Sequence, residues 1–128
     1  MFKGSAAGGS KAVGDEAESR ALAWLRARGL TLLERNYRVA RGPHARGGEV
    51  DLILRDRDGT FVFVEVRARA AAGFGGAAAS IGAAKRSRLV FAARHYLQRY
   101  AAPPPCRFDV VAIDGERVEW LAAAFDAE

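Results

Sequence analysis

The sequence "GGEVDLILRDRDGTFVFVEVRAR" spans residues 47–69 and has the pattern of a β-hairpin. Two runs rich in β-branched and aromatic residues are separated by a polar turn, as in paired strands. Three acidic residues, Glu49, Asp51 and Glu65, interrupt these runs. A sheet interior normally excludes charges, because burying an unpaired carboxylate is costly. The hairpin is therefore predicted to carry a functional site.

The turn fixes the register of this hairpin. Arg57-Asp58-Gly59 suits a three-residue loop with Gly59 in the left-handed conformation. One side of the ribbon is then predicted to be aliphatic, with the cross-strand pairs Leu54–Val62, Leu52–Val64 and Val50–Val66. The other side is predicted to carry the pairs Ile53–Phe63, Asp51–Glu65 and Glu49–Arg67. A two-residue loop would mix the two sides and is rejected.

Three carboxylates and one guanidinium thus gather at one end of the ribbon. Two carboxylates about 5 Å apart repel by roughly 3 kcal/mol at an effective dielectric near 20, so a cation is expected between them. Arg67 can neutralise one charge, and the remainder suits Mg²⁺ or Mn²⁺, which prefer oxygen ligands. The alternative is an exposed Glu49–Arg67 pair with Asp51 and Glu65 solvated at a sheet end. Projection of Asp51 and Glu65 to opposite sides would exclude the metal site.

Further elements are predicted on both sides of the hairpin. Residues 1–13 lack periodicity and are predicted to be a disordered lead-in to a single domain over 14–128. The remaining patterns predict a helix over 15–28, a strand over 30–40, a helix over about 80–100, and strands over 107–113 and 117–122. The order α-β-β-β-α-β-β predicts an α/β fold with a mixed β-sheet flanked by helices.

Glu18 in the first predicted helix has two interpretations. With Asp15 as N-cap, Glu18 takes the capping-box position and needs no other role. It also lies on the helical stripe of Leu22 and Leu25, which faces inward. Both interpretations stay open at this level.

The net charge of +5, from 20 basic and 15 acidic residues, favours a polyanionic partner such as nucleic acid. The loop "RGPHARGG" (41–48) is a candidate contact for phosphates. The predicted contacts to a nucleic-acid backbone are Arg38, Arg41, Arg46, Lys85, Arg86 and Arg88.

No run of about 18 uncharged apolar residues is present, so no membrane-spanning helix and no membrane partner are expected. The first residues lack the apolar centre of a secretory signal, which favours a cytoplasmic location. Cys106 has no second cysteine to pair with and is predicted to be a small core residue.

Six segments in this order resemble the YraN family of uncharacterised bacterial proteins. They are "GDEAESRALAWLRARG", "ERNYR", "GGEVDLILR", "VFVEVRAR", "GAAASIGAAKRSRLVFAARHYL" and "CRFDVVAI". "GEVD" followed by "VEVR" also resembles the PD-(D/E)XK nuclease superfamily, and YraN proteins are similar to archaeal Holliday-junction resolvases. The resemblance runs from about Gly14 to the C-terminus and implies a restriction-endonuclease-like sheet.

The resemblance implies roles for individual residues. Asp51 and Glu65 correspond to the ligands of Mg²⁺ or Mn²⁺, with the Val66 carbonyl as a third. Glu18 matches the first-helix glutamate of resolvase-like members. Glu49 belongs to the "GE" that precedes the aspartate in YraN proteins.

Arg67 stands where the superfamily usually has lysine. Arginine stays charged, so it can clamp a phosphate but cannot take a proton from water. Lys85 matches a lysine of the YraN pattern and is expected to approach the same phosphate, although a solvated helix residue is an equal alternative.

Together, the residues and the resemblance imply metal-dependent hydrolysis of phosphodiester bonds in DNA, selective for branched or flapped structures. The alternative is a nucleic-acid-binding or scaffold protein with a nuclease fold and weak or absent catalysis, which the arginine at position 67 favours. A homodimer is an open expectation, because resolvase-like relatives are symmetric dimers.

Overall fold

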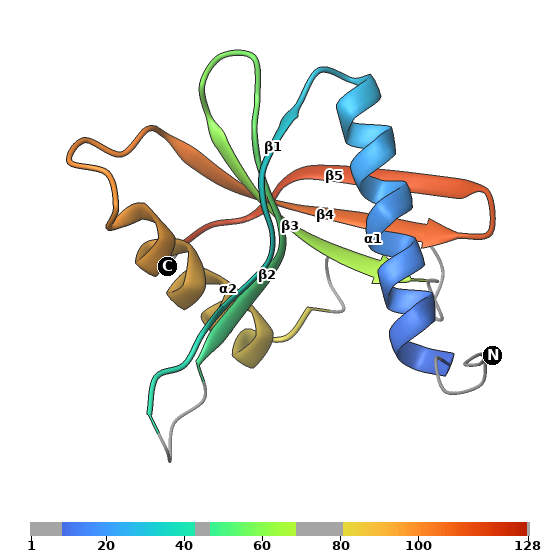
Figure 1. Cartoon of the computed structure of the whole chain (residues 1–128), viewed down its shortest axis with the longest axis horizontal. Coiled ribbons are helices and arrows are strands. Elements are labelled where there is room, and N and C mark those ends of the chain that lie inside the picture. The colour runs from blue at the N-terminus through green and yellow to red at the C-terminus, as the bar shows by residue number, and fades with distance from the viewer. Residues whose placement is uncertain (1–8, 43–46, 69–80, 128) are drawn as a thin grey trace, which may run out of the picture.

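The computed structural model describes residues 9–42, 47–68 and 81–127. Its elements are α1 (Gly9–Ala27), β1 (Thr31–Val39), β2 (Gly48–Arg55), β3 (Phe61–Ala68), α2 (Ala83–Leu97), β4 (Cys106–Asp114) and β5 (Arg117–Phe125). The strands form one sheet in sequential order, in which β3 and β4 are parallel and the other neighbours antiparallel. The two helices pack on opposite faces (Figure 1). The predicted restriction-endonuclease-like arrangement and the element order are confirmed.

Both helices differ from their predicted bounds. α1 begins at Gly9 instead of residue 15, so it extends into the predicted disordered lead-in, of which residues 1–8 lie outside the described part. α2 begins at Ala83, because Gly82 is extended and its carbonyl accepts the Arg86 N–H at 3.0 Å. Its last turn ends at Leu97, whose carbonyl accepts the Tyr100 N–H at 3.0 Å. The Gly/Ala-rich connection over 69–80 lies outside the described residues.

The β2–β3 turn has the predicted geometry. Gly59 has φ +92°, and the Asp56 N–H donates to the Thr60 carbonyl at 2.8 Å. The register that follows contains the predicted pairs Leu54–Val62, Ile53–Phe63 and Leu52–Val64. The three-residue loop is therefore confirmed, and the faces of the central strands follow from it.

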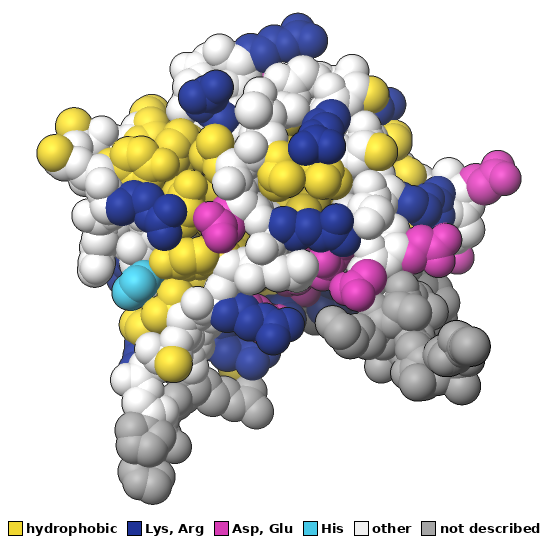
Figure 2. Space-filling view, in the orientation of Figure 1, with side chains coloured by type: hydrophobic (Ala, Val, Ile, Leu, Met, Phe, Trp, Pro, Cys, Tyr) yellow, Lys and Arg dark blue, Asp and Glu magenta, His cyan; other side chains and the backbone are white. Residues whose placement is uncertain are grey.

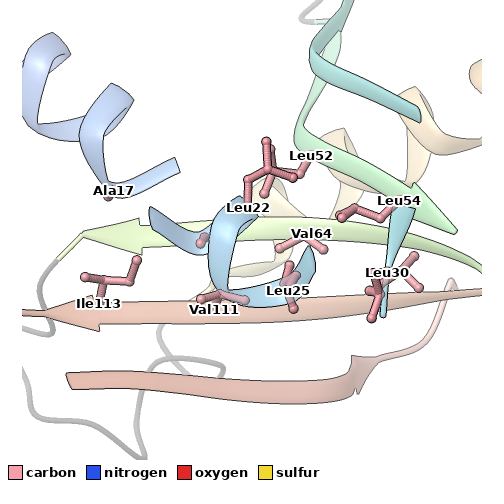
Figure 3. Packing of buried hydrophobic residues seen from close by; sticks show 11 residues of the cluster. Ala17, Leu22, Leu25, Leu30, Leu52, Leu54, Val64, Val111 and Ile113 are labelled. Atoms are coloured by element: carbon pink, nitrogen blue, oxygen red, sulfur yellow. The ribbon is translucent and has the colours of Figure 1, made fainter. Parts of the chain in front are cut away.

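Two apolar layers hold the helices on the sheet. Under α1, Leu22 and Leu25 pack with Leu52, Leu54 and Val64 of the central strands (Figure 3). Burying one such side chain contributes about 1.5–3 kcal/mol. The layer under α2 contains Ile53, Phe63, Leu89, Tyr96 and Phe108. Apolar residues on both faces explain why the central strands lack a simple polar-apolar alternation.

Val50 was predicted on the aliphatic side with Leu52 and Leu54, and this prediction was wrong. Val50 packs in the layer under α2. The change of face occurs opposite Asn36, whose φ of 56° is left-handed in the middle of β1. A non-glycine residue in this conformation is strained, and such strain often lies at a functional site.

Two smaller observations concern other predictions. Cys106 is exposed at the first residue of β4, so its assignment to the core was wrong; the buried run of this strand starts only at Phe108. In the described part of the chain, none of the helices is both long and apolar enough to cross a membrane.

Asp109 is a fully buried carboxylate of β4, with 0% exposure. Its oxygens accept hydrogen bonds from Arg107 Nε at 3.0 Å, Trp120 Nε1 at 2.8 Å and the Ala123 N–H at 2.8 Å. Arg107 also binds Asp56 Oδ2 at 3.0 Å, at the end of the β2–β3 turn. Asp109 therefore fixes the irregular pairing of β4 and β5 and joins it to the central hairpin.

We expect Asp109→Ala to lower the free energy of unfolding by roughly 3–5 kcal/mol, because it removes a buried acceptor and leaves the half-buried Arg107 and Trp120 donors without it. Urea unfolding followed by circular dichroism measures this loss. Glu116→Ala, in the exposed β4–β5 turn, is the control and should stay within about 0.5 kcal/mol of the parent. A loss below about 1 kcal/mol for Asp109→Ala would contradict the assignment.

Candidate active site

The central feature of the site is a separation of β2 from β3. Their ladder ends at the pair Leu52–Val64. Beyond it β2 continues along β1 and β3 along β4, so the two strands diverge (Figure 1). Asp51 fills the opening, and its Oδ2 accepts the Val66 N–H at 2.8 Å. A side-chain carboxylate thus replaces a backbone carbonyl as the acceptor in the sheet.

Glu65 is the second acid of the opening, and it is buried, with 4% exposure. The Asp51 carboxylate lies close enough to interact with it electrostatically. Burial, and then repulsion by Asp51, raise the pKa of Glu65 to about 7. Lys85 Nζ lies 3.4 Å from Glu65 Oε2, and Arg67 Nη1 lies 3.9 Å from the same oxygen. Both cations lower the pKa of Glu65 and so oppose this rise. The alternative of a solvated Glu65 at a sheet end was wrong.

Burial is also the main reason that the pKa of Asp51 is raised. The Val66 N–H is the first of the interactions that favour its charged form, followed by the Lys85 ammonium. The hydrogen bond and the cation therefore do not fully offset the cost of burial. Burial therefore disfavours the charged forms of both Asp51 and Glu65 in spite of the neighbouring cations.

Glu18 of α1 approaches the opening between β2 and β3 from the face of the sheet that α1 covers. Its pKa is raised by burial and then by Asp51, and its Oε1 is buried without a hydrogen-bond partner. Arg35 Nε lies 3.6 Å from that oxygen. Because α1 begins at Gly9, Glu18 lies within the helix, so the capping-box interpretation was wrong and the inward-facing one is confirmed.

Glu49 lies at the exposed rim of the site. It pairs with Arg38 at 3.6 Å, so the predicted Glu49–Arg67 pair was wrong, because β2 and β3 separate before they reach it. A pocket of about 420 Å³, which we call the carboxylate pocket, opens here on the α1 side. Its lining residues are Gly14, Asp15, Glu18, Asn36, Arg38, Glu49, Val50 and Asp51.

The predicted phosphate contacts are distributed around α2 and the rim. Arg88 is half-buried and lines a hollow of about 440 Å³ that also contains Arg38 and Glu49; its Nε is buried without a hydrogen-bond partner. Arg41 and Arg86 are exposed. Arg46 lies outside the described residues. Figure 2 shows basic side chains on several sides of a group of acidic ones.

Arg35 is a site residue that the sequence did not reveal. Its guanidinium binds the Asp15 carbonyl and Ser19 Oγ, both at 3.0 Å, in addition to approaching Glu18. It therefore fixes the part of α1 that presents Glu18. The signal was hidden because Arg35 lies in a strand whose alternation is interrupted at Asn36.

The donors of the opening fit a hard divalent cation in kind. Glu18, Asp51 and Glu65 are carboxylates whose pKa values are raised, in each case mainly by burial, and carboxylate oxygens are the ligands that such a cation prefers. In the described ranges, however, no three His, Cys, Asp or Glu side chains are grouped closely enough to hold a metal ion.

A mixed sheet between two helices, with a half-buried Asp and a buried Glu where its central strands separate, defines the restriction-endonuclease-like class of α/β proteins. The sequence pattern of the uncharacterised protein family UPF0102 matches residues 17–113. The chain belongs to this family, which is the YraN family that its motifs indicated.

Similar relatives are UPF0102 proteins from several bacteria. The protein from Methylibium petroleiphilum is 68% identical over 118 residues, which cover 92% of this chain and 97% of the relative. That from Paracidovorax citrulli is 66% identical, with coverages of 92% and 85%. That from Cupriavidus taiwanensis is 56% identical over 127 residues, with coverages of 99% and 92%.

We expect Glu65→Gln to stabilise the metal-free protein at pH 8 by about 1–3 kcal/mol and to have little effect at pH 5. The pKa of Glu65 is higher in the folded state, so the folded protein binds the proton more tightly. The free energy of unfolding therefore falls as pH rises from about 4.5 to 7, and glutamine, which mimics the protonated acid, removes this loss.

Urea unfolding in EDTA at both pH values measures the effect. Glu116→Gln removes a charge from an exposed turn and should stay within about 0.5 kcal/mol of the parent at both. Destabilisation by Glu65→Gln at pH 8 would show that the charged form of Glu65 is stabilising.

Proposed function

We propose that this protein is a metal-dependent endonuclease that hydrolyses phosphodiester bonds in DNA, with a preference for branched or flapped structures. The observation that supports it is the position of half-buried Asp51 next to buried Glu65 in the opening between β2 and β3. Two adjacent acids destabilise the fold when both are charged, so a purely structural role would favour neutral residues. The resemblance of its motifs to the PD-(D/E)XK superfamily supports the same proposal.

Asp51, Glu65 and the Val66 carbonyl would hold Mg²⁺ or Mn²⁺. When bound, such a cation lowers the pKa of a coordinated water and polarises the scissile phosphate. Asp51 is oriented for this role by the Val66 N–H, which holds one of its two oxygens. Glu18 adds negative charge from the α1 side, and Arg35 holds Glu18 in position.

Lys85 and Arg67 provide the positive charge that a phosphate needs. Both lie within 4 Å of Glu65, one from α2 and the other from β3. A phosphodiester at the opening places its oxygens between these cations, which then offset the charge that develops in the transition state. Arg67 acts as a clamp, because a guanidinium keeps its proton at every accessible pH.

The surrounding arginines bind the rest of the substrate through its backbone. Arg38 and Arg88 line the hollow next to Glu49, beside the carboxylate pocket. Contacts of this kind fix position without reading bases, which favours recognition of DNA structure over sequence. A homodimer, as in the similar resolvases, stays a prediction.

A nucleic-acid-binding protein without efficient catalysis is the second candidate. Two observations favour it: Arg67 cannot serve as a proton acceptor, and Glu65 already has two cationic neighbours that compete with a metal ion. In this case the protein binds branched DNA and leaves it intact.

We expect the protein to cleave flapped or branched DNA in Mg²⁺ or Mn²⁺, and Asp51→Asn and Glu65→Gln each to lower the rate at least about 100-fold, because each removes a charged ligand. Gel assays with branched, flapped, single-stranded and duplex DNA measure cleavage. Thermal melting with and without Mn²⁺ measures metal binding separately, and the stabilisation by Mn²⁺ should be lost in both variants.

Glu116→Gln is the control and should cleave like the parent. Binding of these substrates with no cleavage in either metal, unchanged by Asp51→Asn, would support the second candidate and overturn the endonuclease.

Variants of Arg67 test whether this residue clamps the phosphate or has only a structural role. We expect Arg67→Ala to lower cleavage roughly 100-fold and Arg67→Lys to retain it within about tenfold, since lysine preserves the charge. Steady-state rates on the best flapped substrate measure this. Arg26→Ala, exposed on α1, is the matched control. Equal rates for Arg67→Ala and the parent would contradict the clamp.

A further inference from the structure

A second pocket, of about 610 Å³, lies along the outer side of α2 and is lined by different residues from the carboxylate pocket. We call it the α2 pocket. It is formed by Arg41, Ile81, Gly82, Ala83, Arg86, Ser87, Val90, Phe91, Arg94, Asp126 and Ala127. Its volume is in the range of pockets that bind a small ligand, about 300–1,000 Å³.

Three guanidinium groups in the α2 pocket are held by neutral partners. Arg86 Nε donates to the Ile81 carbonyl at 3.1 Å, and Arg94 donates to the Ala127 carbonyl at 3.3 Å. The Arg41 guanidinium lies 4.2 Å from the centre of the Phe91 ring. Each group is thus oriented by contacts that leave its positive charge in place.

Within residues 9–42, 47–68 and 81–127, these arginines form no ion pair. Among the residues that the structure describes, the ion pairs engage Arg35, Arg38, Arg67 and Arg107, but not the three arginines of the α2 pocket. Asp126 also lines the pocket and forms no ion pair with them in this part of the chain. The α2 pocket is therefore complementary to an anion.

The wall of the α2 pocket is apolar and aromatic. It contains Val90, Phe91 and Ile81, of which Ile81 is almost fully buried. Inorganic phosphate has no apolar surface to place against this wall. A nucleotide combines an anion with a flat ring that stacks on an aromatic side chain or on a guanidinium plane. Nucleotide chemistry thus matches both halves of the lining.

The first turn of α2 contributes residues both to the α2 pocket and to the Asp51–Glu65 site. Lys85 contacts Glu65 in the opening between β2 and β3. Arg86, the next residue, points to the α2 pocket, because successive helical residues diverge by about 100°. One strand can therefore contact both sites by passing over this turn.

We propose that the α2 pocket binds one unpaired nucleotide of the strand whose phosphate lies at the Asp51–Glu65 site. This inference rests on the proposed function and adds the reason for its substrate preference. Only a single-stranded segment can place a base in the α2 pocket, because a paired base is held in its stack. The protein therefore selects DNA with unpaired nucleotides next to the scissile bond.

Fluorescence anisotropy with a short labelled oligothymidylate tests the proposal in EDTA, where cleavage plays no part. We expect Phe91→Ala to weaken binding roughly 10-fold, the effect of losing one base stack, and Phe91→Leu to show a similar loss. Arg94→Gln should weaken it as well. Arg26→Gln removes the same charge from α1 and should change affinity less than twofold.

Three comparisons decide the outcome. An abasic strand of equal length should bind weakly and be insensitive to Phe91→Ala, and a duplex should behave likewise. Equal binding of normal and abasic strands, or no effect of either Phe91 variant, would overturn the base pocket even if cleavage is found. Free thymidine monophosphate should compete only weakly; competition as strong as that of the strand would assign the α2 pocket to a free nucleotide and overturn the proposal. Retained strand selectivity with no cleavage would refute only the endonuclease.

Discussion

The hydrogen bond from the Val66 N–H to the Asp51 carboxylate is the interaction on which the site depends. It forms where β2 leaves β3, so an amide that would otherwise lose its sheet partner is satisfied by a side chain. Gly48 makes the new path of β2 possible, because any side chain there would collide with the Arg88 carbonyl of α2. The separation of the strands thus creates the space for the acidic pair and also determines which residues enter it.

Two kinds of buried acid in this protein show the difference between a structural and a functional carboxylate. Asp109 is fully buried, yet its oxygens are satisfied by a guanidinium, an indole and a backbone amide. Glu65 is nearly as buried, but its neighbours include Asp51, and its pKa rises to about 7. A fold can use the first arrangement to fix a strand register. The second stores unfavourable electrostatic energy, which a cation or a proton relieves.

The basic residues of helix α2 contact both the acidic opening and its basic surroundings. Its first turn sends Lys85 to the acidic opening and Arg86 to the α2 pocket, while Arg88 faces the rim near Glu49. A divalent cation needs negative ligands, and the phosphates of a nucleic acid need positive charges close by. The basic residues of α2 supply positive charges on several sides of the helix. Part of the basic excess of the chain therefore lies around a local negative site.

The sequence by itself determined the central hairpin, its register from the turn to the pair Leu52–Val64 and the order of the elements, because turn chemistry and side-chain period act over a few residues. It also identified Asp51 and Glu65 as a convergent pair. Only the tertiary structure decided that Arg38, not Arg67, pairs with Glu49, since the strands separate where local pairing rules would continue them. The orientation of Arg35 and the meeting of Arg41 with α2 likewise depend on contacts between distant segments, which no local pattern records.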